Sequence, residues 1–315
     1  KRRPRPPRAS ATEGRRVSEV GAFWLLLPVA AGLSWYFARR GSARVSGRQV
    51  DRLRANYFRG LNYLLNEQPD KAIEVFLQIA EVDSDTVETH LALGNLFRRR
   101  GEVDRAIRVH QNLIARPTLS PEQKTAALLE LGEDYMRAGL LDRAETLFSD
   151  LVGIDVRAAS ALRHLISIYQ QERDWNKAID ATRRMEELAK QPYFKEIAQY
   201  HCELAQAALL KADYAKAAAE LDAAFAAYRG CARATLLAGD AQSQQGRPAD
   251  AIAAWQKIES QNPAFLSLAA DRFADAYRKL SESAQGIRVL RSYQAQYPSL
   301  DLLNALFTLV LEHEG

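Results

Sequence analysis

The side chains best able to do chemistry in this chain are few and lie far apart. Its 315 residues include five histidines and two cysteines, and the cysteines form no C-x-x-C pair. The sequence has no Gly-rich phosphate loop, no H-E-x-x-H helix and no G-x-S-x-G turn. His201 and Cys202 are adjacent, so on a helix they face different ways and do not make a thiolate pair. We therefore predict no catalytic, cofactor-binding or metal-binding residues, and a protein that is not an enzyme.

Recognition chemistry is the better candidate, because polar side chains recur at comparable places of successive predicted helices. An asparagine amide together with several arginines could clamp the backbone and the carboxylates of a bound peptide. The alternative is structural: Arg98–Arg100 precede Gly101 at a helix end, where cations offset the helix dipole and cap carbonyls. Both interpretations stay open. The candidate groove residues are Asn95, Arg98, Arg99, Glu133, Arg137, Arg163 and Gln170.

The elements that must position these residues follow from a repeat of small side chains. Seven small residues succeed one another at spacings of 34, 38, 34, 39, 34 and 35. They are Ala72, Ala106, Ala144, Ala178, Ala217, Ala251 and Gly286. Twelve residues before each lies a second small or medium residue, namely Gly60, Gly94, Gly132, Ile166, Ala205, Gly239 and Ala274. Two antiparallel helices pack tightly only where the facing side chains are small, and larger neighbours fill the rest of the seam.

This pattern is typical of tetratricopeptide repeats, helix pairs that bury their apolar faces only against stacked neighbours. We predict an all-α fold in which residues 55–298 form a superhelical solenoid of about seven repeats. Two longer joints, 115–123 and 188–196, account for the larger spacings, and Ser120 followed by Pro121 is typical of a helix start. His90 and His110 occupy matching seam positions, which favours packed, hydrogen-bonded histidines over metal ligands. Residues 299–315 form one more apolar helix without a partner, to be covered by a further C-terminal segment or another protein.

An uncharged segment near the N-terminus predicts a membrane anchor. Residues 20–38 contain no charge over 19 positions, close to the length that spans a bilayer. Aromatic rings lie toward its ends, where they favour the interface, and two arginines follow at once. A signal peptide is the alternative, but no A-x-A-like cleavage site followed by a Cys-paired domain is present. The predicted anchor residues are Trp24, Pro28, Trp35, Tyr36, Arg39 and Arg40.

The net positive charge is concentrated on the two sides of this segment. Residues 1–19 hold seven Lys or Arg and are predicted to be a disordered basic tail, and residues 39–54 are predicted to be a basic juxtamembrane linker. If translation starts near Val17, the tail is not native and the linker places the repeats in the cytoplasm. Two unpaired cysteines agree with a reducing compartment. The net charge of +4 leaves the repeats close to neutral or slightly acidic, which argues against a nucleic-acid partner.

Four stretches resemble the lipopolysaccharide assembly protein B family of Gram-negative bacteria. They are WLLLPVAAGLSWYFARR (24–40), NYLLNEQPDKAIEVFLQ (62–78), VETHLALGNLFRRRGEVDRAIRVHQNLI (87–114) and LGEDYMRAGLLDRAETLF (131–148). The resemblance covers about residues 20–315. It implies a single-pass inner-membrane protein with cytoplasmic repeats, and a C-terminal rubredoxin-like knuckle that holds a metal with two C-x-x-C pairs. This sequence lacks both pairs, so no cofactor is expected in it.

The resemblance also implies a function. A family member acts as an adaptor that promotes degradation of the deacetylase committing precursor to lipid A synthesis, by a membrane AAA+ protease of the FtsH type. A second inner-membrane protein antagonises it. The alternative is a scaffold that gathers lipopolysaccharide assembly and transport enzymes. Expected partners are therefore the protease, the deacetylase, the antagonist and membrane lipid, with self-association through the uncovered last helix or the segment around Pro28 as a further expectation.

Overall fold

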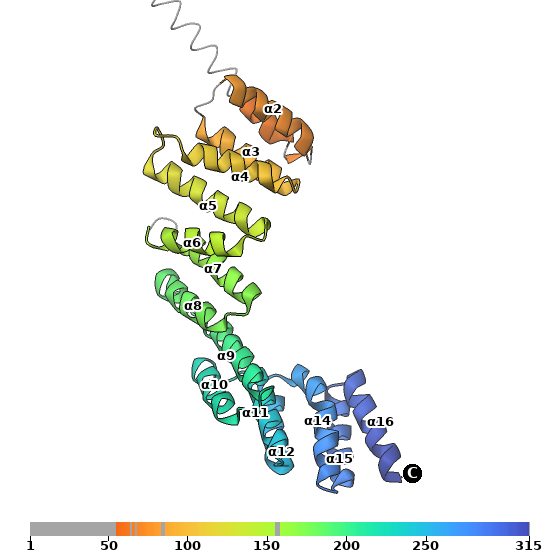
Figure 1. The fold of residues 1–315 in the computed structure, drawn as a ribbon. Coiled ribbons are helices and arrows are strands. Elements are labelled where there is room, and N and C mark those ends of the chain that lie inside the picture. Colours follow the sequence, from red (N-terminus) through yellow and green to blue (C-terminus); the bar gives the residue numbers. More distant parts are fainter. Residues whose placement is uncertain (1–54, 64, 67, 83–85, 155–157, 315) are drawn as a thin grey trace, which may run out of the picture. The chain divides into compact units, whose positions relative to one another are not determined.

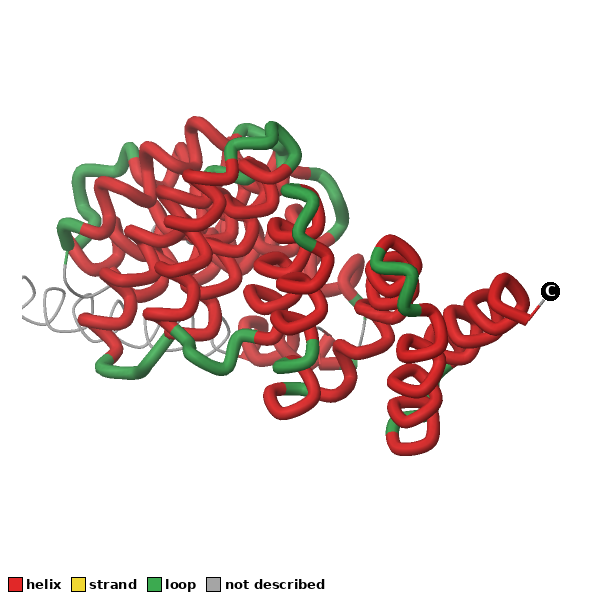
Figure 2. Tube along the Cα trace, turned by 90° about the horizontal axis from the view of Figure 1, so that it is seen from below, coloured by secondary structure: helices red, strands yellow, loops and turns green. Residues whose placement is uncertain are grey.

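The computed structural model describes residues 55–314, except 64, 67, 83–85 and 155–157 (Figure 1). The tail, the anchor and the linker expected within residues 1–54 lie outside this part. Every regular element in the described part is helical, which confirms the all-α prediction (Figure 2). None of the helices described is both long and apolar enough to cross a bilayer. The chain divides into two compact units, residues 1–109 and 110–315, and each is described by itself.

The first unit packs its helices around two phenylalanines. It contains helical residues 55–63, α2 (Pro69–Val82), α3 (Val87–Arg99) and the start of α4 (Val103–Ile114). Phe76 and Phe97 are buried in one apolar cluster, and the ring of Tyr57 meets that of Phe76 edge-on at 5.7 Å. A Cβ atom at Gly60 would lie 2.8 Å from the Phe76 ring. This helix therefore approaches α2 as closely as it does because residue 60 has no side chain.

The second unit is a series of helices that each pack on their neighbours in the chain. Close contacts join α5 to α6, α7 to α8, α9 to α10 and α11 to α12, and others join the second helix of one pair to the first of the next. The bounds are α5 (Pro121–Arg137), α6 (Leu141–Val152), α7 (Ala158–Glu172), α8 (Trp175–Ala189), α9 (Phe194–Leu209), α10 (Tyr214–Ala227), α11 (Ala232–Gln244), α12 (Pro248–Trp255), α13 (Ile258–Gln261), the 3₁₀ turn η2 (Pro263–Phe265), α14 (Leu266–Lys279), α15 (Ser283–Gln296) and α16 (Leu300–Glu314).

The small side chains lie at the helix contacts, as their spacing predicted. The six repeat alanines from Ala72 to Ala251 are all fully buried. A second residue follows the small residue of each first helix by sixteen positions. The two meet where a Cβ atom added at Gly60, Gly132 or Gly239 would lie within 2.8 Å of Phe76, Phe148 or Trp255, respectively. Where the first residue is Gly, the later one is Phe, His or Trp. Where the first residue is Ile or Ala, the later one is Thr or Leu, which has no ring. The pairs are Gly60–Phe76, Gly94–His110, Gly132–Phe148, Ile166–Thr182, Ala205–Leu221, Gly239–Trp255 and Ala274–Leu290.

The turn between the two helices of a repeat takes a left-handed backbone conformation in the six repeats where the structure describes this position. Seven residues after the small residue, φ is +82° at Gly101, +75° at Gly139 and +73° at Gly246. The other repeats place Arg173, Ala212 and Ser281 at this position, with φ between 56° and 59°. An L-residue with a Cβ atom is less stable in this region than glycine. The fold therefore requires this conformation even where the sequence does not favour it.

Two histidines at the contacts between helices are packed and hydrogen-bonded, as their sequence positions predicted. Nδ1 of His110 lies 2.6 Å from Oδ2 of Asp134, and both side chains are fully buried, so the ring donates to the carboxylate. Nδ1 of His90 lies 2.9 Å from the carbonyl oxygen of Thr86. The interpretation of these two residues as packed, hydrogen-bonded histidines is confirmed. The helix start predicted at Ser120 is also confirmed, since Ser120 and Gln123 form a reciprocal capping box at α5.

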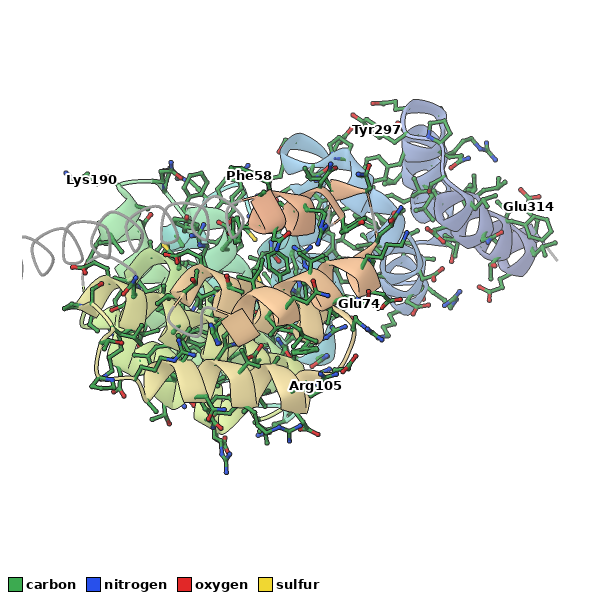
Figure 3. The ribbon with its side chains drawn as sticks, turned by 90° about the horizontal axis from the view of Figure 1, so that it is seen from above. Phe58, Glu74, Arg105, Lys190, Tyr297 and Glu314 are labelled. Carbon is green, nitrogen blue, oxygen red and sulfur yellow. The ribbon has the colours of Figure 1, made fainter. Side chains whose placement is uncertain are left out.

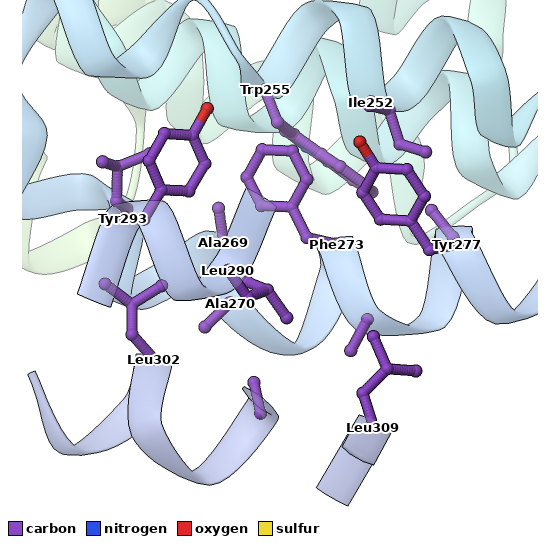
Figure 4. Close-up of a cluster of buried hydrophobic side chains, with 14 of the residues drawn as sticks. Ile252, Trp255, Ala269, Ala270, Phe273, Tyr277, Leu290, Tyr293, Leu302 and Leu309 are labelled. Atoms are coloured by element: carbon purple, nitrogen blue, oxygen red, sulfur yellow. The ribbon is translucent and has the colours of Figure 1, made fainter. Parts of the chain in front are cut away.

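The last helix has one covered face and one uncovered face. Leu302, Ala305 and Leu309 are buried against α14 and α15, and in Figure 4 Leu302 and Leu309 point toward the rings of Phe273 and its neighbours. Figure 3 shows α16 running from near Tyr297 to Glu314. The opposite stripe is exposed. It consists of Leu300, Leu303, Phe307 and Leu311.

Reciprocal substitutions at the turn position test the backbone conformation. We expect Ala212→Gly to stabilise the protein by about 1 kcal/mol, and Gly246→Ala to destabilise it by about 1–2 kcal/mol, because only glycine is unstrained at positive φ. Nothing lies within 4 Å of a Cβ atom at Gly246, so crowding does not contribute. Midpoints of urea unfolding measure both changes. Ala138→Gly is the matched control, since φ is −77° at Ala138 and the change there should destabilise. Changes in stability of the same sign for Ala212→Gly and Ala138→Gly would contradict the left-handed conformation at position 212.

A single methyl group tests the helix contact. A Cβ atom at Gly239 would lie 2.1 Å from Nε1 of Trp255, which donates a hydrogen bond to the Leu236 carbonyl oxygen at 3.0 Å. We expect Gly239→Ala to lower the free energy of unfolding by about 1–3 kcal/mol, as overpacked cores do. The control is Gly153→Ala, where φ is −70° and the nearest atom lies at an ordinary 3.4 Å. Equal urea midpoints for the two variants would show that α11 and α12 can separate freely.

Candidate protein-binding groove

A leucine-lined hollow runs over the first helices of three successive repeats in the second unit. Its cavity volume is about 310 Å³, and it is bordered by α9, α11 and α14. Leu210, directly after α9, is 83% exposed, and Leu268 of α14 is 53% exposed. The lining residues are Gln206, Leu209, Leu210, Arg233, Leu236, Leu237, Asp240, Gln244, Leu268 and Arg272. Two of the five leucines that line the hollow are therefore exposed, and the other three are buried.

Two arginines at this hollow are held in place by neighbouring side chains. Arg233 pairs with Glu203 at 2.7 Å and donates to Gln206 at 2.9 Å. The Nε atom of Arg272 donates to Asp240 at 2.7 Å. Each guanidinium is therefore ordered before anything binds, and the ordering cost of binding is reduced. Because each charge has an acidic partner, the hollow offers polar edges around an apolar floor and not a strong positive field.

The repeat explains why these residues share one face. One position after the small residues Ala205 and Gly239 come Gln206 and Asp240. Six positions before the small residues Gly239 and Ala274 come Arg233 and Leu268. Residues at the same repeat position lie side by side when the first helices of successive repeats stack. Within the second unit, Glu133 of the groove candidates occupies the same repeat position as Gln206 and Asp240.

The structure gives the predicted groove residues separate surroundings. Within the second unit, Oε1 of Glu133 lies 3.3 Å from Nε2 of His164, a ring that stacks on Phe148. Arg163 donates to Ser160 at 3.2 Å, and Gln170 donates to the Tyr200 hydroxyl at 2.6 Å. Arg137 is exposed in the last turn of α5. Whether these four side chains bind a partner stays a prediction.

The remaining candidates belong to the first unit. Arg98 and Arg99 lie in the last turn of α3, where their charges favour the helix dipole. The Oδ1 atom of Asn95 is buried and has no hydrogen-bond partner among the described residues. The dipole interpretation therefore accounts for the two arginines, whereas the asparagine amide keeps an unused acceptor. The prediction that these three residues bind a partner likewise stays open.

The candidate set omitted the leucine-lined hollow because it was chosen for polar groups that could hold a peptide. Carrying the repeat positions of Asn95 and Glu133 forward, one residue after the small residue, leads directly to Gln206 and Asp240. The apolar residues beside them, such as Leu210, look like ordinary helix residues in the sequence. Their exposure appears only when the packed helices are in place.

The described residues offer no cluster of side chains arranged to hold a metal ion. Among the described residues no group of three or more His, Cys, Asp or Glu side chains could hold a metal ion. His201 is engaged by Glu220, with Nδ1 2.7 Å from Oε2. The hollow combines an apolar floor with paired polar side chains at its edge.

Paired helices that meet at buried alanines, with a leucine-lined face on their first helices, define a tetratricopeptide-repeat protein. Models of the tetratricopeptide repeat match residues 89–124 and 202–264. Lipopolysaccharide assembly protein B of Escherichia coli K12 is 40% identical over 93% of this chain and 75% of its own length. The protein of that name from Haemophilus influenzae is 36% identical over 78% of this chain and 63% of its own length. The chain belongs to the lipopolysaccharide assembly protein B family, which confirms the resemblance in its sequence.

Solved structures agree on the fold. The C-terminal part of a tetratricopeptide-repeat protein from Cytophaga hutchinsonii aligns with a TM-score of 0.50, at 15% identity, over 79% of this chain and 99% of the other. At this identity the likeness bears on the fold alone. Together with the repeat matches, it supports a stacked array of helical repeats.

Proposed function

We propose that this chain is an adaptor in the regulation of lipopolysaccharide synthesis. It holds the deacetylase that commits precursor to lipid A synthesis beside a membrane AAA+ protease of the FtsH type, and the protease then degrades the deacetylase. The names of its relatives support a role in lipopolysaccharide assembly or its regulation. The observation that carries the adaptor mechanism is the exposed leucine hollow on a repeat scaffold, a surface suited to a protein partner.

The hollow has enough apolar surface to contribute to a specific complex. Fully burying one leucine side chain stabilises by about 1.5–3 kcal/mol. Leu210 and Leu268 together could therefore supply a substantial part of the about 8 kcal/mol that corresponds to micromolar affinity. The ordered Arg233 and Arg272 would satisfy polar groups at the edge of a bound segment. An apolar centre inside a polar rim is the usual anatomy of a protein–protein interface.

The proposed location makes the adaptor effective at low abundance. The uncharged residues 20–38 are proposed to anchor the chain in the inner membrane, in contact with lipid, with the repeats on the cytoplasmic side. A tether confines the repeats to the membrane surface, so encounters with a membrane-bound protease occur at a raised effective concentration. An inner-membrane antagonist would work in the same confined layer. Self-association through the exposed stripe of α16 belongs to this proposal as well.

The half-life of the deacetylase is the first test of the function. Cells depleted of this chain should keep the deacetylase clearly longer after translation is blocked, because its delivery to the protease is lost. Restoring the full chain should shorten the half-life again. An unchanged half-life together with altered lipopolysaccharide output would contradict the adaptor, and would favour a scaffold that gathers assembly and transport enzymes without changing their abundance.

A charge in the hollow tests the proposed surface. Leu210→Asp should weaken binding of the purified deacetylase to the full chain at least about tenfold, a loss of 1.4 kcal/mol or more, because a carboxylate would replace an exposed leucine that the bound partner covers. Binding is measured by titration with the chain in detergent. The matched control is Leu188→Asp on α8, an exposed leucine that does not line the hollow. Thermal midpoints should stay unchanged in both variants, since both sites face solvent.

Arg163→Glu distinguishes the hollow from the earlier groove candidates. Arg163 is exposed on α7, away from the lining of the hollow. If the deacetylase binds at the hollow, this charge reversal should leave its affinity within about twofold of the unchanged protein, as is usual for a surface charge outside the contact. Strong loss with Arg163→Glu and normal binding with Leu210→Asp would move the client surface to the third and fourth repeats.

A further inference from the structure

Two cysteines that are distant in the sequence meet in the core of the second unit. Cys202 lies in α9, and Cys231 is the residue immediately before α11. Their Sγ atoms are 3.8 Å apart, both thiols are free, and both side chains are buried. They share an apolar cluster with Ala198, Ala234 and Leu237. A pair of sulfurs at van der Waals distance is close to the geometry of a disulfide but has not formed one.

The surroundings of the two sulfurs are unequal. The hydrogen bond from the Cys202 thiol lowers the pKa of Cys231 to about 6, with help from the backbone N–H groups of Ala234 and Arg233 and the Arg233 charge. The same hydrogen bond, together with burial, raises the pKa of Cys202. The Nε2 atom of Gln199 also points at Sγ of Cys231, at 3.7 Å. These surroundings favour Cys231 as the sulfur of the pair that ionises first.

Cys231, and not Cys202, borders a cavity. Cys231 lines a second cavity of about 220 Å³, bordered by Lys195, Gln199, Arg233 and Phe265 among others. The volume exceeds the about 30 Å³ that one water molecule occupies in the liquid, so a hydrogen peroxide molecule fits easily. Cys202 does not line this cavity, so an oxidant that enters it meets Cys231 first.

We propose that Cys231 and Cys202 are a reversible oxidation site, at which a peroxide converts the two thiols into a disulfide through attack by Cys231. The Cys231 thiolate attacks one peroxide oxygen; the S–O bond forms, the O–O bond breaks, and hydroxide leaves. Cys231 is then a sulfenic acid, and hydroxide takes the Cys202 proton to become water. The Cys202 sulfur attacks Cys231; the S–S bond forms, the S–O bond breaks, and hydroxide leaves and takes a proton from solvent to become a second water. The thiols lose two electrons in total, and the peroxide gains them.

The bond would act on the helices that border the leucine hollow. Closing it brings the sulfurs from 3.8 Å to about 2.0 Å, which draws α9 and the start of α11 together or rotates their side chains. These helices contribute Gln206, Leu209, Arg233 and Leu236 to the hollow, and Arg233 lines both cavities. Oxidation would thus fix the spacing of two walls of the proposed binding surface. The thiol chemistry itself does not depend on the proposed function.

Other roles for the pair fit less well. Two thiols alone are too few for a structural metal site, which takes four ligands, and no third ligand joins them among the described residues. A permanent structural disulfide does not fit two free thiols. Transient, redox-sensing disulfides are the kind found in reducing compartments. Unequal sulfurs with one favoured thiolate are the arrangement such sites use.

The test maps the bond in the full chain. The purified protein in detergent is reduced, exposed to graded hydrogen peroxide, denatured and blocked with a maleimide. Intact mass and peptide mapping should show loss of two hydrogens, no maleimide on either cysteine, and one linked peptide joining Cys202 to Cys231. Dithiothreitol should restore both thiols. Two cysteines that both take up maleimide, after a peroxide dose that oxidises the thiolate of a low-pKa control peptide, would overturn the proposal, as would linkage between two chains.

Matched variants test which sulfur attacks. In Cys202→Ser, peroxide should leave a sulfenic acid on Cys231 that dimedone traps; in Cys231→Ser, Cys202 should resist the same dose. Equal trapping in both variants would overturn the assignment of the attacking sulfur. A pH profile of the unchanged protein decides the matter even if a variant fails to fold. Alkylation of Cys231 should be nearly flat from pH 7 to 9, whereas an ordinary thiol gains more than about tenfold over that range. A tenfold rise at Cys231 would contradict the thiolate.

Discussion

The distance between the two helices of a repeat is the constraint on which the rest of this structure depends. It is set by side-chain volume at two positions sixteen residues apart. Trp255 can fill its place only because residue 239 is glycine, since a Cβ atom there would lie 2.1 Å from the indole. Where the first position holds Ile166, the later one shrinks to Thr182. Interiors are packed too densely to absorb a mismatch, so a large side chain at the later position requires a small one at the first. A stable spacing within each pair then permits the next pair to stack.

The second repeat uses this constraint in a different way from the others. Its later position holds His110, a polar ring where Phe76, Phe148 and Trp255 stand in other repeats. Burying an imidazole requires a partner, and Asp134 of α5 supplies one at 2.6 Å. The pair therefore joins α5 to the residue that fills the seam, with a directional bond in place of apolar contact alone. A hydrogen bond fixes orientation more narrowly than packing does, so this joint is expected to be the most specific in the array.

The sequence predicted the helix pairs well because their spacing depends on local volume. Small residues at fixed intervals reveal the register, and Ser120 with Pro121 reveals a helix start. The leucine hollow was missed because exposure of Leu210 depends on how successive helices stack, and an exposed leucine and a buried one look the same in a sequence. The approach of Cys202 and Cys231 was missed for a related reason. They are 29 residues apart, occupy different places in their repeats, and meet only because Cys231 precedes α11 on the side that faces α9. Contacts within a repeat recur at a fixed spacing in the sequence. Contacts between repeats have no such spacing, so the sequence does not reveal them.

The leucine hollow and the thiol pair draw on the same contact between α9 and α11. In a repeat array each unit touches only its neighbours, so a bond at one joint changes local stability without remodelling distant repeats. A disulfide between Cys202 and Cys231 would stiffen this joint alone, while the Gly132–Phe148 seam kept its own geometry. Rigid walls reduce the ordering cost of a partner that fits them and exclude one that requires them to move apart. The sign of the effect on binding is therefore set by the spacing that the partner needs. The second unit thus has the means to let oxidation at the core alter recognition at the surface.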